Sequence, residues 1–277
     1  MTTPRPRAGI ENASTRFFYS ATAAKFFTNA WYSLVTALDK NGDATVMNYG
    51  FADLDGGRLA LDPRFELHRY GVQLYHHVAS RAELRGKDVL EIGCGRGGGA
   101  SYLAGAMQPR RYVGLDFNRR AVAFDRRSYA EQQNLRFVAG DAHAIPFPDA
   151  HFDVALNVES SHHYADLDRF LREVHRVLKP GGVFLMACFP RGDEPAALRA
   201  AVGRSDFVCT LDEDITANVV LALELDSPRR EEALRRLCPA PLRTFGREFA
   251  GTRGSKLYES FASGERRYVN FVLRKAD

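Results

Sequence analysis

A glycine-rich turn between a short apolar run and a helix is the feature that most restricts how this chain folds. Residues 87–99 read KDVLEIGCGRGGG, and a helix-compatible run, ASYLAGAM, follows directly. Glycines in such a turn let backbone N–H groups approach a ligand, and the start of a helix favours a carboxylate or phosphate. The pattern predicts the first strand, turn and helix of a nucleotide-binding α/β fold.

Apolar runs and helical patterns alternate after this turn. We expect strands near residues 88–92, 111–116, 135–139, 152–158 and 182–189, and helices near 98–107, 118–131 and 166–178. Two later extended segments, about 242–250 and 266–274, suggest an antiparallel pair, with a short helix at 254–263 between them. Because parallel strands need helical crossovers, the sequence predicts an α/β fold with a doubly wound, mostly parallel, seven-stranded sheet.

The regions outside this alternation differ in character. Helical patterns at residues 12–38 and 65–82 predict an N-terminal helical cap over residues 1–83, followed by a core at 84–277. Residues 190–240 are polar and helix-compatible. We expect them to form a helical lid inserted between strands 5 and 6, because insertions of this kind commonly serve as substrate walls.

Composition excludes several classes of partner. Lysine and arginine number 38 against 34 acidic residues, and no block of like charges suggests nucleic-acid binding. No apolar run approaches the roughly 20 residues that a membrane span needs. The N-terminus lacks the apolar core of a signal peptide, and the four cysteines form no C-x-x-C pair. We therefore expect a cytoplasmic protein with reduced thiols and no metal site; the oligomeric state is left open.

Acidic residues at the ends of two expected strands narrow the choice of ligand. The glycine spacing alone fits a dinucleotide or another adenosine ligand. Asp116 ends the second strand in YVGLDFN, where a carboxylate accepts hydrogen bonds from ribose hydroxyls. Asp141 and Ala142 follow the third strand. That carboxylate can accept from an adenine amino group, and the next backbone N–H can donate to a ring nitrogen.

Four segments in a fixed order carry a family resemblance. VLEIGCGRGGG, GLDFN, GDAHAIPF and RVLKPGG, within about residues 87–189, resemble the class I S-adenosylmethionine-dependent methyltransferases. The resemblance implies S-adenosyl-L-methionine as the cofactor and S-adenosyl-L-homocysteine as the product, in preference to NAD(P). It also implies a Rossmann-like methyltransferase fold, with which the late antiparallel pair agrees.

The resemblance also implies a set of cofactor-binding residues. It places the methionine part at the glycine turn, the ribose and adenine at the second strand, and the adenine edge after the third. Glu91 either acts through the loop N–H groups or braces the glycine turn, and Tyr49 either closes over the cofactor or packs in the core. The expected set is Tyr49, Gln73, Glu91, Gly93, Cys94, Gly95, Asp116, Phe117, Asp141, Ala142 and Asn157.

A closer resemblance extends over most of the chain. GGGASYL, NVESSHHY and FGREFAGTRGSKLYESFASGERRY are similar to phthiotriol/phenolphthiotriol dimycocerosates methyltransferases and related natural-product O-methyltransferases. This implies O-methylation of a hydroxyl on a small-molecule acceptor that is large and partly apolar: a polyketide, macrolide, lipid or attached sugar. The chain departs from the lipid enzymes across residues 12–60 and 190–240, where an acceptor would be contacted.

His162 is the candidate general base. It follows the fourth strand in NVESSHHY, at the sheet edge where ligands bind, and histidine can take the proton of a hydroxyl. Glu159, three residues earlier, either shares a helical turn with His162 and orients the imidazole or lines the methionine end of the cofactor. A sterol- or quinone-type C-methyltransferase, a non-methylating cyclase that retains the cofactor, and a non-catalytic binding module remain alternatives.

Overall fold

A seven-stranded sheet organises the part of the chain that the computed structural model describes, residues 44–190 and 194–277. The expected helix at 12–38 lies outside these residues, as does about half of the region assigned to an N-terminal cap. The strands are β1 (Asp88–Ile92), β2 (Arg111–Asp116), β3 (Leu135–Ala139), β4 (Phe152–Val158), β5 (Leu178–Cys188), β6 (Phe207–Asp214) and β7 (Val269–Lys275).

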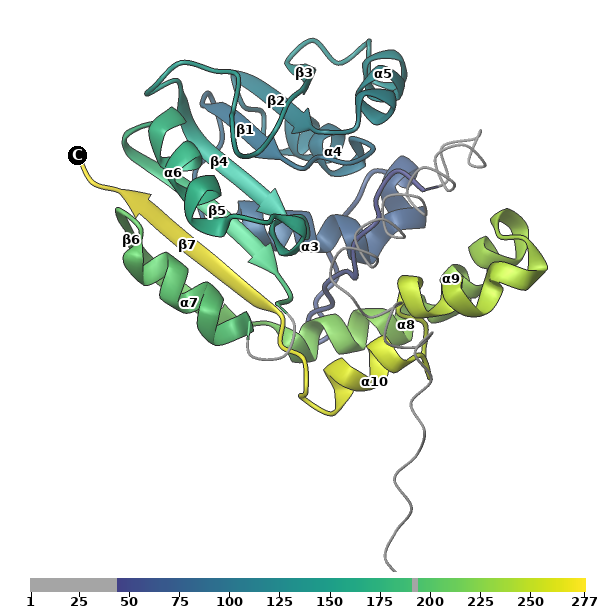
Figure 1. Ribbon diagram of the computed structural model, residues 1–277. Coiled ribbons are helices and arrows are strands. Elements are labelled where there is room, and N and C mark those ends of the chain that lie inside the picture. The colour runs from purple at the N-terminus through teal and green to yellow at the C-terminus, as the bar shows by residue number, and fades with distance from the viewer. Residues whose placement is uncertain (1–43, 191–193) are drawn as a thin grey trace, which may run out of the picture. The chain divides into compact units, whose positions relative to one another are not determined.

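The strand order is β3-β2-β1-β4-β5-β7-β6, with β7 antiparallel to both of its neighbours and the other pairs parallel (Figure 1). Strand β1 is buried along its whole length, as expected for a central parallel strand covered on both faces. The order reverses between β1 and β4, so their carboxyl ends form the switch point where ligands bind in such sheets. The predicted fold class is confirmed.

Helices cover both faces of the sheet (Figure 1). One buried apolar cluster joins the sheet to α3 (Arg69–Ala79), α4 (Gly98–Ala106) and α5 (Arg119–Ser128). A second cluster joins the opposite face to α6 (Leu167–Val177) and α7 (Glu194–Arg204). Short 3-10 segments, η1 (Pro63–His68) and η2 (Ser161–His163), precede α3 and follow β4.

Side-chain caps explain where several helices begin. The Asn118 side chain accepts hydrogen bonds from the backbone N–H groups of Arg120 and Ala121 at the start of α5. Asp166 accepts from Arg169 N–H at the start of α6. Such caps satisfy backbone donors that have no partner within the helix.

The second half of the chain corrects two predictions. Residues 242–250, expected as a strand, form the 3-10 segment η3 (Ala240–Leu242) and α9 (Arg243–Ala250) instead. The sixth strand, β6, lies at Phe207–Asp214, inside the segment assigned to a lid. The helical insertion therefore follows β6 and precedes β7, whereas we placed it between strands 5 and 6.

That insertion consists of α8 (Thr216–Leu237), η3, α9 and α10 (Lys256–Ala262). Its side chains join the cluster that also contains α3, through Val219 and Leu223 of α8 and Phe261 of α10. None of the helices in the described ranges is long and apolar enough to cross a membrane.

Candidate active site

The glycine turn after β1 adopts backbone angles that side chains rarely take. Gly93, Gly95 and Gly97 have φ values of 78°, 58° and 71°. A Cβ on Gly93 would lie 2.2 Å from the Oγ of Ser160, so a side chain has no room there. The N–H of Gly93 donates to the Leu115 carbonyl at 2.7 Å, which fixes the turn against the end of β2. The turn thus requires glycine for both conformation and space.

Asp116 lies at the end of β2 and faces this turn. Its carboxylate accepts hydrogen bonds of 2.8 Å from the N–H of Gly95 and 2.8 Å from the N–H of Asn118. Burial raises the pKa of Asp116, and the two N–H donors oppose that rise. Because an ionised carboxylate has about four acceptor positions, it retains capacity for hydroxyl donors.

Glu91 lies beneath the turn and is fully buried. Its carboxylate accepts from the hydroxyl of Tyr75 at 2.7 Å and from that of Tyr112 at 2.9 Å. Burial raises the pKa of Glu91 to about 7, against the lowering effect of both hydroxyls. These hydrogen bonds join α3 and β2 to β1, and both roles predicted for Glu91 stay predictions.

Asn157 connects the ends of β1 and β4. Its amide nitrogen donates to the Ile92 carbonyl at 2.9 Å and to Ser160 Oγ at 2.6 Å, and its oxygen accepts from Ser161 N–H at 3.1 Å. The side chain is completely buried. Asn157 therefore holds Ser160 against Gly93, directly beside the glycine turn.

The residues expected at the adenine end lie after β2 and β3. Asp141 accepts from the backbone N–H of His143 at 2.8 Å, and this bond, with the His143 ring, lowers the pKa of Asp141. Ala142 is 7% exposed. Phe117, next to Asp116, is 80% exposed. A large apolar side chain this open can cover a ligand without rearranging the core.

The Gln73 side chain forms its hydrogen bonds with the chain around α3 and not at the glycine turn. Its amide nitrogen donates to the Phe51 carbonyl at 2.9 Å, and its oxygen accepts from Arg69 at 3.1 Å. Both ends of the amide thus hold the segment before α3. A role on the cofactor's carboxylate stays a prediction.

Glu159 turns the chain sharply after β4, with a φ of 53°. Its carboxylate accepts from the backbone N–H of Tyr49 at 2.7 Å and from the hydroxyl of Tyr268 at 2.9 Å. Burial raises the pKa of Glu159 to about 7, while these two donors and the charge of Arg230 oppose the rise. Glu159 lies outside the 3-10 turn Ser161–His163, so the prediction that it shares a helical turn with His162 is wrong. Glu159, whose φ is in the left-handed region, directly follows the last residue of β4 and precedes the 3-10 turn.

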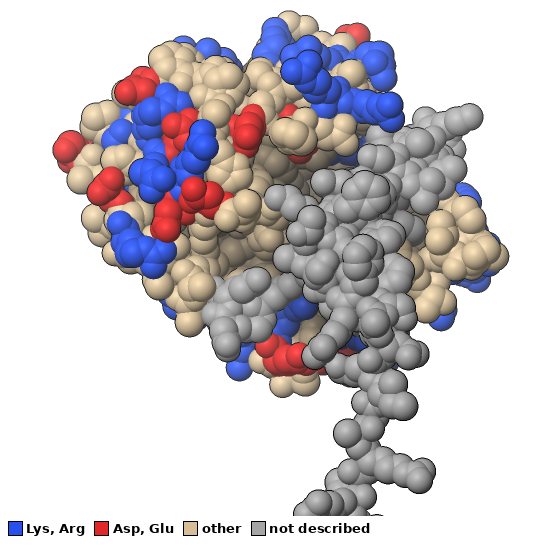
Figure 2. Space-filling model, viewed as in Figure 1, with Lys and Arg blue, Asp and Glu red and all other residues tan. Residues whose placement is uncertain are grey.

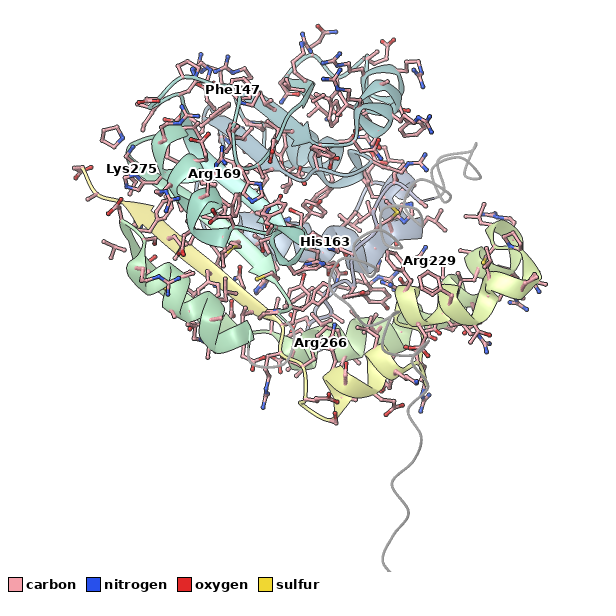
Figure 3. All side chains as sticks on the ribbon, viewed as in Figure 1. Phe147, His163, Arg169, Arg229, Arg266 and Lys275 are labelled. Atoms are coloured by element: carbon pink, nitrogen blue, oxygen red, sulfur yellow. The ribbon has the colours of Figure 1, made fainter. Side chains whose placement is uncertain are left out.

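His162 lies at the carboxyl end of β4 against an aromatic cluster. Its ring centre is 4.2 Å from that of Phe189 and 3.9 Å from that of His163. Figure 3 labels His163 near the ends of β4 and β5. Phe189 in turn contacts Tyr49, Phe261 and Tyr268, with ring centres 4.9, 5.9 and 5.8 Å away. We call Tyr49, His162, Phe189, Phe261 and Tyr268 the aromatic cluster.

These residues fit the cofactor that the sequence implies. A Cβ on Gly95 would meet nothing within 4 Å, so the turn borders open space there. The carboxylates of Asp116 and Asp141 supply acceptors, and Phe189 of the aromatic cluster packs beside His162.

Three members of the aromatic cluster, Phe189, Phe261 and Tyr268, were not predicted as site residues. They come from the end of β5, from α10 and from the start of β7. Phe261 and Tyr268 lie in the segment at residues 245–268 that carries the closer resemblance, but we assigned no role to either.

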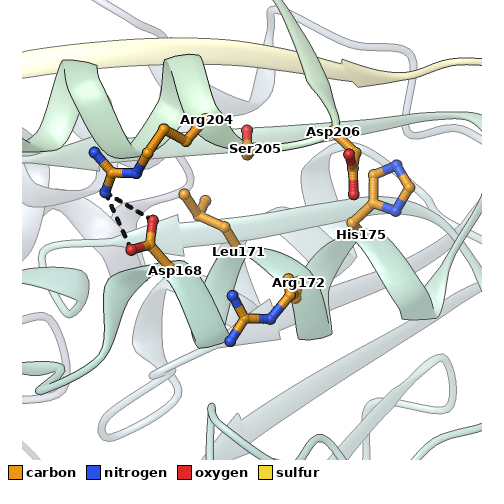
Figure 4. A pocket seen from close by; sticks show the side chains of 7 residues that line it. All are labelled: Asp168, Leu171, Arg172, His175, Arg204, Ser205 and Asp206. Carbon is orange, nitrogen blue, oxygen red and sulfur yellow. Dashed lines mark hydrogen bonds and ion pairs between the residues drawn. The ribbon is translucent and has the colours of Figure 1, made fainter.

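Two other features bear on ligand binding. A hollow of about 270 Å³ between α6 and the turn after α7 is bridged by an ion pair between Asp168 and Arg204 (Figure 4). It is lined by residues of α6, by the last residue of α7 and by the turn that follows. Over residues 44–190 and 194–277, no group of His, Cys, Asp and Glu side chains is arranged to hold a metal ion.

Comparisons with known proteins agree on one family. A family model described as a methyltransferase domain matches residues 90–186. The chain is 40% identical over 245 residues to the fatty-acid O-methyltransferase of Mycolicibacterium smegmatis, a match that covers 88% of each protein. It is 37% identical over 245 residues to the phthiotriol/phenolphthiotriol dimycocerosates methyltransferase of Mycobacterium tuberculosis, covering 88% of this chain and 90% of that one.

A similar solved structure is that of the [4+2]-cyclase SpnF, with a TM-score of 0.65 and 24% sequence identity, covering 89% of this chain and 94% of the other. At that identity the likeness concerns the fold alone.

Proposed function

The chain belongs to the S-adenosylmethionine-dependent methyltransferases, and from that premise we propose that it methylates an oxygen atom of a large, lipid-like acceptor. The position of His162 carries this proposal. The imidazole stands at the carboxyl end of β4, in the aromatic cluster and close in sequence to the cofactor-site residue Asn157. A lipid acceptor fits this setting because the partly exposed ring of Tyr49 can contact an apolar chain while the polar end of the acceptor reaches the imidazole of His162.

The cofactor, when bound, supplies a methyl group that is already activated on a sulfonium. The protein then has mainly to position the acceptor and exclude water. We assign the binding of the cofactor's ribose to Asp116, of its adenine to Asp141, Ala142 and Phe117, and of its methionine end to the glycine turn.

A hydroxyl acceptor also requires a proton acceptor. In our proposal His162 takes the hydroxyl proton as the new C–O bond forms, and later releases it to solvent. Glu159 acts as a positioning residue. It holds Tyr49 and Tyr268 in the aromatic cluster that also contains His162.

A carboxyl acceptor is the second candidate, because one relative at 40% identity is named a fatty-acid O-methyltransferase. A fatty acid is already ionised at neutral pH, so its oxygen needs no base. His162 would then line the site without taking a proton.

Product identification tests the proposal. The full chain is incubated with methyl-labelled S-adenosyl-L-methionine and three acceptor classes: a long-chain secondary alcohol, a long-chain fatty acid, and a lipid extract. We expect the label in an ether or an ester, located by fragmentation. Label on carbon would favour a C-methyltransferase, and an unlabelled isomer of an acceptor would favour a cyclase.

A further inference from the structure

The second half of α8 and the chain as far as the turn after α9 carry an excess of positive charge. Residues 227–254 contain seven arginines and three glutamates. That excess equals the +4 net charge of the whole chain, so the remaining residues are balanced. A local excess of this kind on an otherwise balanced chain suggests an anionic partner.

Four of these arginines line a groove between α8 and α9. The groove has a volume of about 630 Å³, and its lining includes Arg235, Arg243, Arg247 and Arg253. We call these four residues the basic groove. It is separate from the cofactor site, which the glycine turn and the ends of β2 and β3 form.

Ion pairs within the protein neutralise only part of this charge. Asp226, directly before the stretch, pairs with both Arg229 and Arg230. Arg235 pairs with Glu232 at 2.6 Å and Arg247 with Glu231 at 2.9 Å, and both arginine side chains are about 60% exposed. Arg243 donates to the carbonyls of Cys238 and Arg235, which carry no charge. Cationic charge therefore remains available at the surface.

Exposed apolar side chains lie among the same arginines. Leu242 and Phe245 are 40% and 43% exposed, at the start of α9 and within it. At the end of the molecule where Figure 1 places α9, Figure 2 shows apolar or neutral residues (tan) and basic residues (blue). No acidic residue (red) is visible at that end in this view. Arginines interleaved with exposed leucine and phenylalanine are typical of helices that lie in a membrane interface.

The basic groove is connected to the candidate active site. Arg230 of α8 donates to the carbonyl of Tyr49 at 3.2 Å and to that of Ala250 at 2.8 Å. The same helical insertion contributes Phe261 to the aromatic cluster. The basic groove and part of the aromatic cluster thus belong to the same helical insertion.

We propose that the basic groove, with Leu242 and Phe245, docks the enzyme on a bilayer that contains anionic phospholipid. The arginines contact the headgroups, and the two apolar side chains enter the boundary with the acyl chains. Docking there would bring a bilayer-dissolved acceptor next to the aromatic cluster. The docking itself does not depend on which oxygen the enzyme methylates.

Vesicle flotation of the full chain tests the proposal. We expect binding to phosphatidylcholine vesicles that contain phosphatidylglycerol, and little binding to phosphatidylcholine alone. The double variant R235Q/R253Q should bind roughly 25-fold more weakly, since one arginine near an anionic surface contributes about fivefold. F245Q should also weaken binding. None of these residues lies in the proposed cofactor or acceptor machinery, so activity on a short soluble acceptor should stay unchanged.

The charge-matched control is R120Q/R127Q, which removes two exposed arginines from α5 beside β3. This variant should bind anionic vesicles like the parent. Equal loss in both double variants would show attraction by overall charge and overturn the proposal. The proposal would also be overturned if the parent bound phosphatidylcholine vesicles as tightly as anionic ones. The same holds if it bound an acidic carrier protein but no vesicles. Loss of methyl transfer with intact vesicle binding would instead count against the proposed function.

Discussion

The carboxylate of Glu159 accepts a hydrogen bond of 2.7 Å from the backbone N–H of Tyr49, a residue 110 positions earlier in the chain. Tyr268, from the other end of the chain, donates its hydroxyl to the same oxygen at 2.9 Å. One side chain therefore joins the segment before α3, the end of β4 and the start of β7. The aromatic cluster depends on this junction, because both tyrosines belong to it.

Replacing Glu159 should loosen that junction. Glu159→Ala leaves the Tyr49 N–H and the Tyr268 hydroxyl without their acceptor, at a cost of about 1–3 kcal/mol for each buried donor. We expect a lower free energy of unfolding in urea and a lower kcat. Glu159→Gln keeps an amide oxygen at the same position and serves as the control. It should lose clearly less stability than the alanine variant; equal losses would mean that the two hydrogen bonds contribute little.

The buried carboxyl of Glu91 should make stability depend on pH. Its pKa is raised from the usual 4.5 to about 7 by burial, so the folded state binds the proton more tightly than the unfolded chain does. The stabilisation is complete below pH 4.5 and is lost as pH rises through about 7. A shift of this size corresponds to about 3 kcal/mol.

Urea unfolding across this pH range measures the effect. The parent should lose stability from pH 5 to pH 8, and Glu91→Gln, which does not titrate, should show a flatter profile. Burial also raises the pKa of Glu159 to about 7 and that of Asp125 to about 8. Both contribute in the same direction, so some slope should remain. Parallel profiles for parent and variant would contradict the assignment to Glu91.

Gly93→Ala should damage the cofactor site in two ways. Its positive φ costs an alanine about 1–2 kcal/mol, and its Cβ would lie 2.2 Å from Ser160 Oγ. Gly86→Ala is a matched control, since Gly86 has a φ of 70° and nothing within 4 Å of a Cβ. We expect both variants to be less stable, but only Gly93→Ala to bind S-adenosyl-L-homocysteine more weakly by calorimetry. Equal affinities would place the cofactor away from this turn.

His162→Ala should separate the two acceptor chemistries. With a hydroxyl acceptor, loss of a general base lowers kcat by about 10²–10⁴-fold while cofactor affinity stays the same. The rate of the parent should fall on the acid side of its pH profile as the imidazole gains a proton, and the variant should lack that dependence. With a fatty acid as acceptor, the kcat of His162→Ala should stay close to that of the parent. His163→Ala controls for the loss of an adjacent ring.

The parallel half of the fold was predictable because local signals agree there. Strands β1 to β4 have the predicted bounds, since buried parallel strands are short apolar runs and turn residues flank them. Asp116 and Asn157 could be singled out because each ends or nearly ends such a strand, at the carboxyl edge of the sheet.

The antiparallel edge was not predictable in the same way. Strand β6 reads FVCTLDED, and only its first residue, Phe207, is buried, so it lacks the apolar run of a central strand. Residues 242–250 contain Leu242, Phe245 and Phe249 at a helical spacing, which we interpreted as an extended segment. Phe189, Phe261 and Tyr268 were missed because they come from three distant elements. Their separations along the sequence do not indicate that their rings are in contact.

Phe117 offers a test of the cofactor assignment that is almost free of structural effects. The side chain is 80% exposed, so Phe117→Ala should leave the free energy of unfolding nearly unchanged. If the ring stacks on adenine, its loss removes about 1 kcal/mol of aromatic contact and weakens S-adenosyl-L-homocysteine binding about fivefold. Phe117→Tyr keeps the ring and should bind like the parent. Unchanged affinity in the alanine variant would remove Phe117 from the site and leave Asp116 as the residue at this strand end that binds the cofactor.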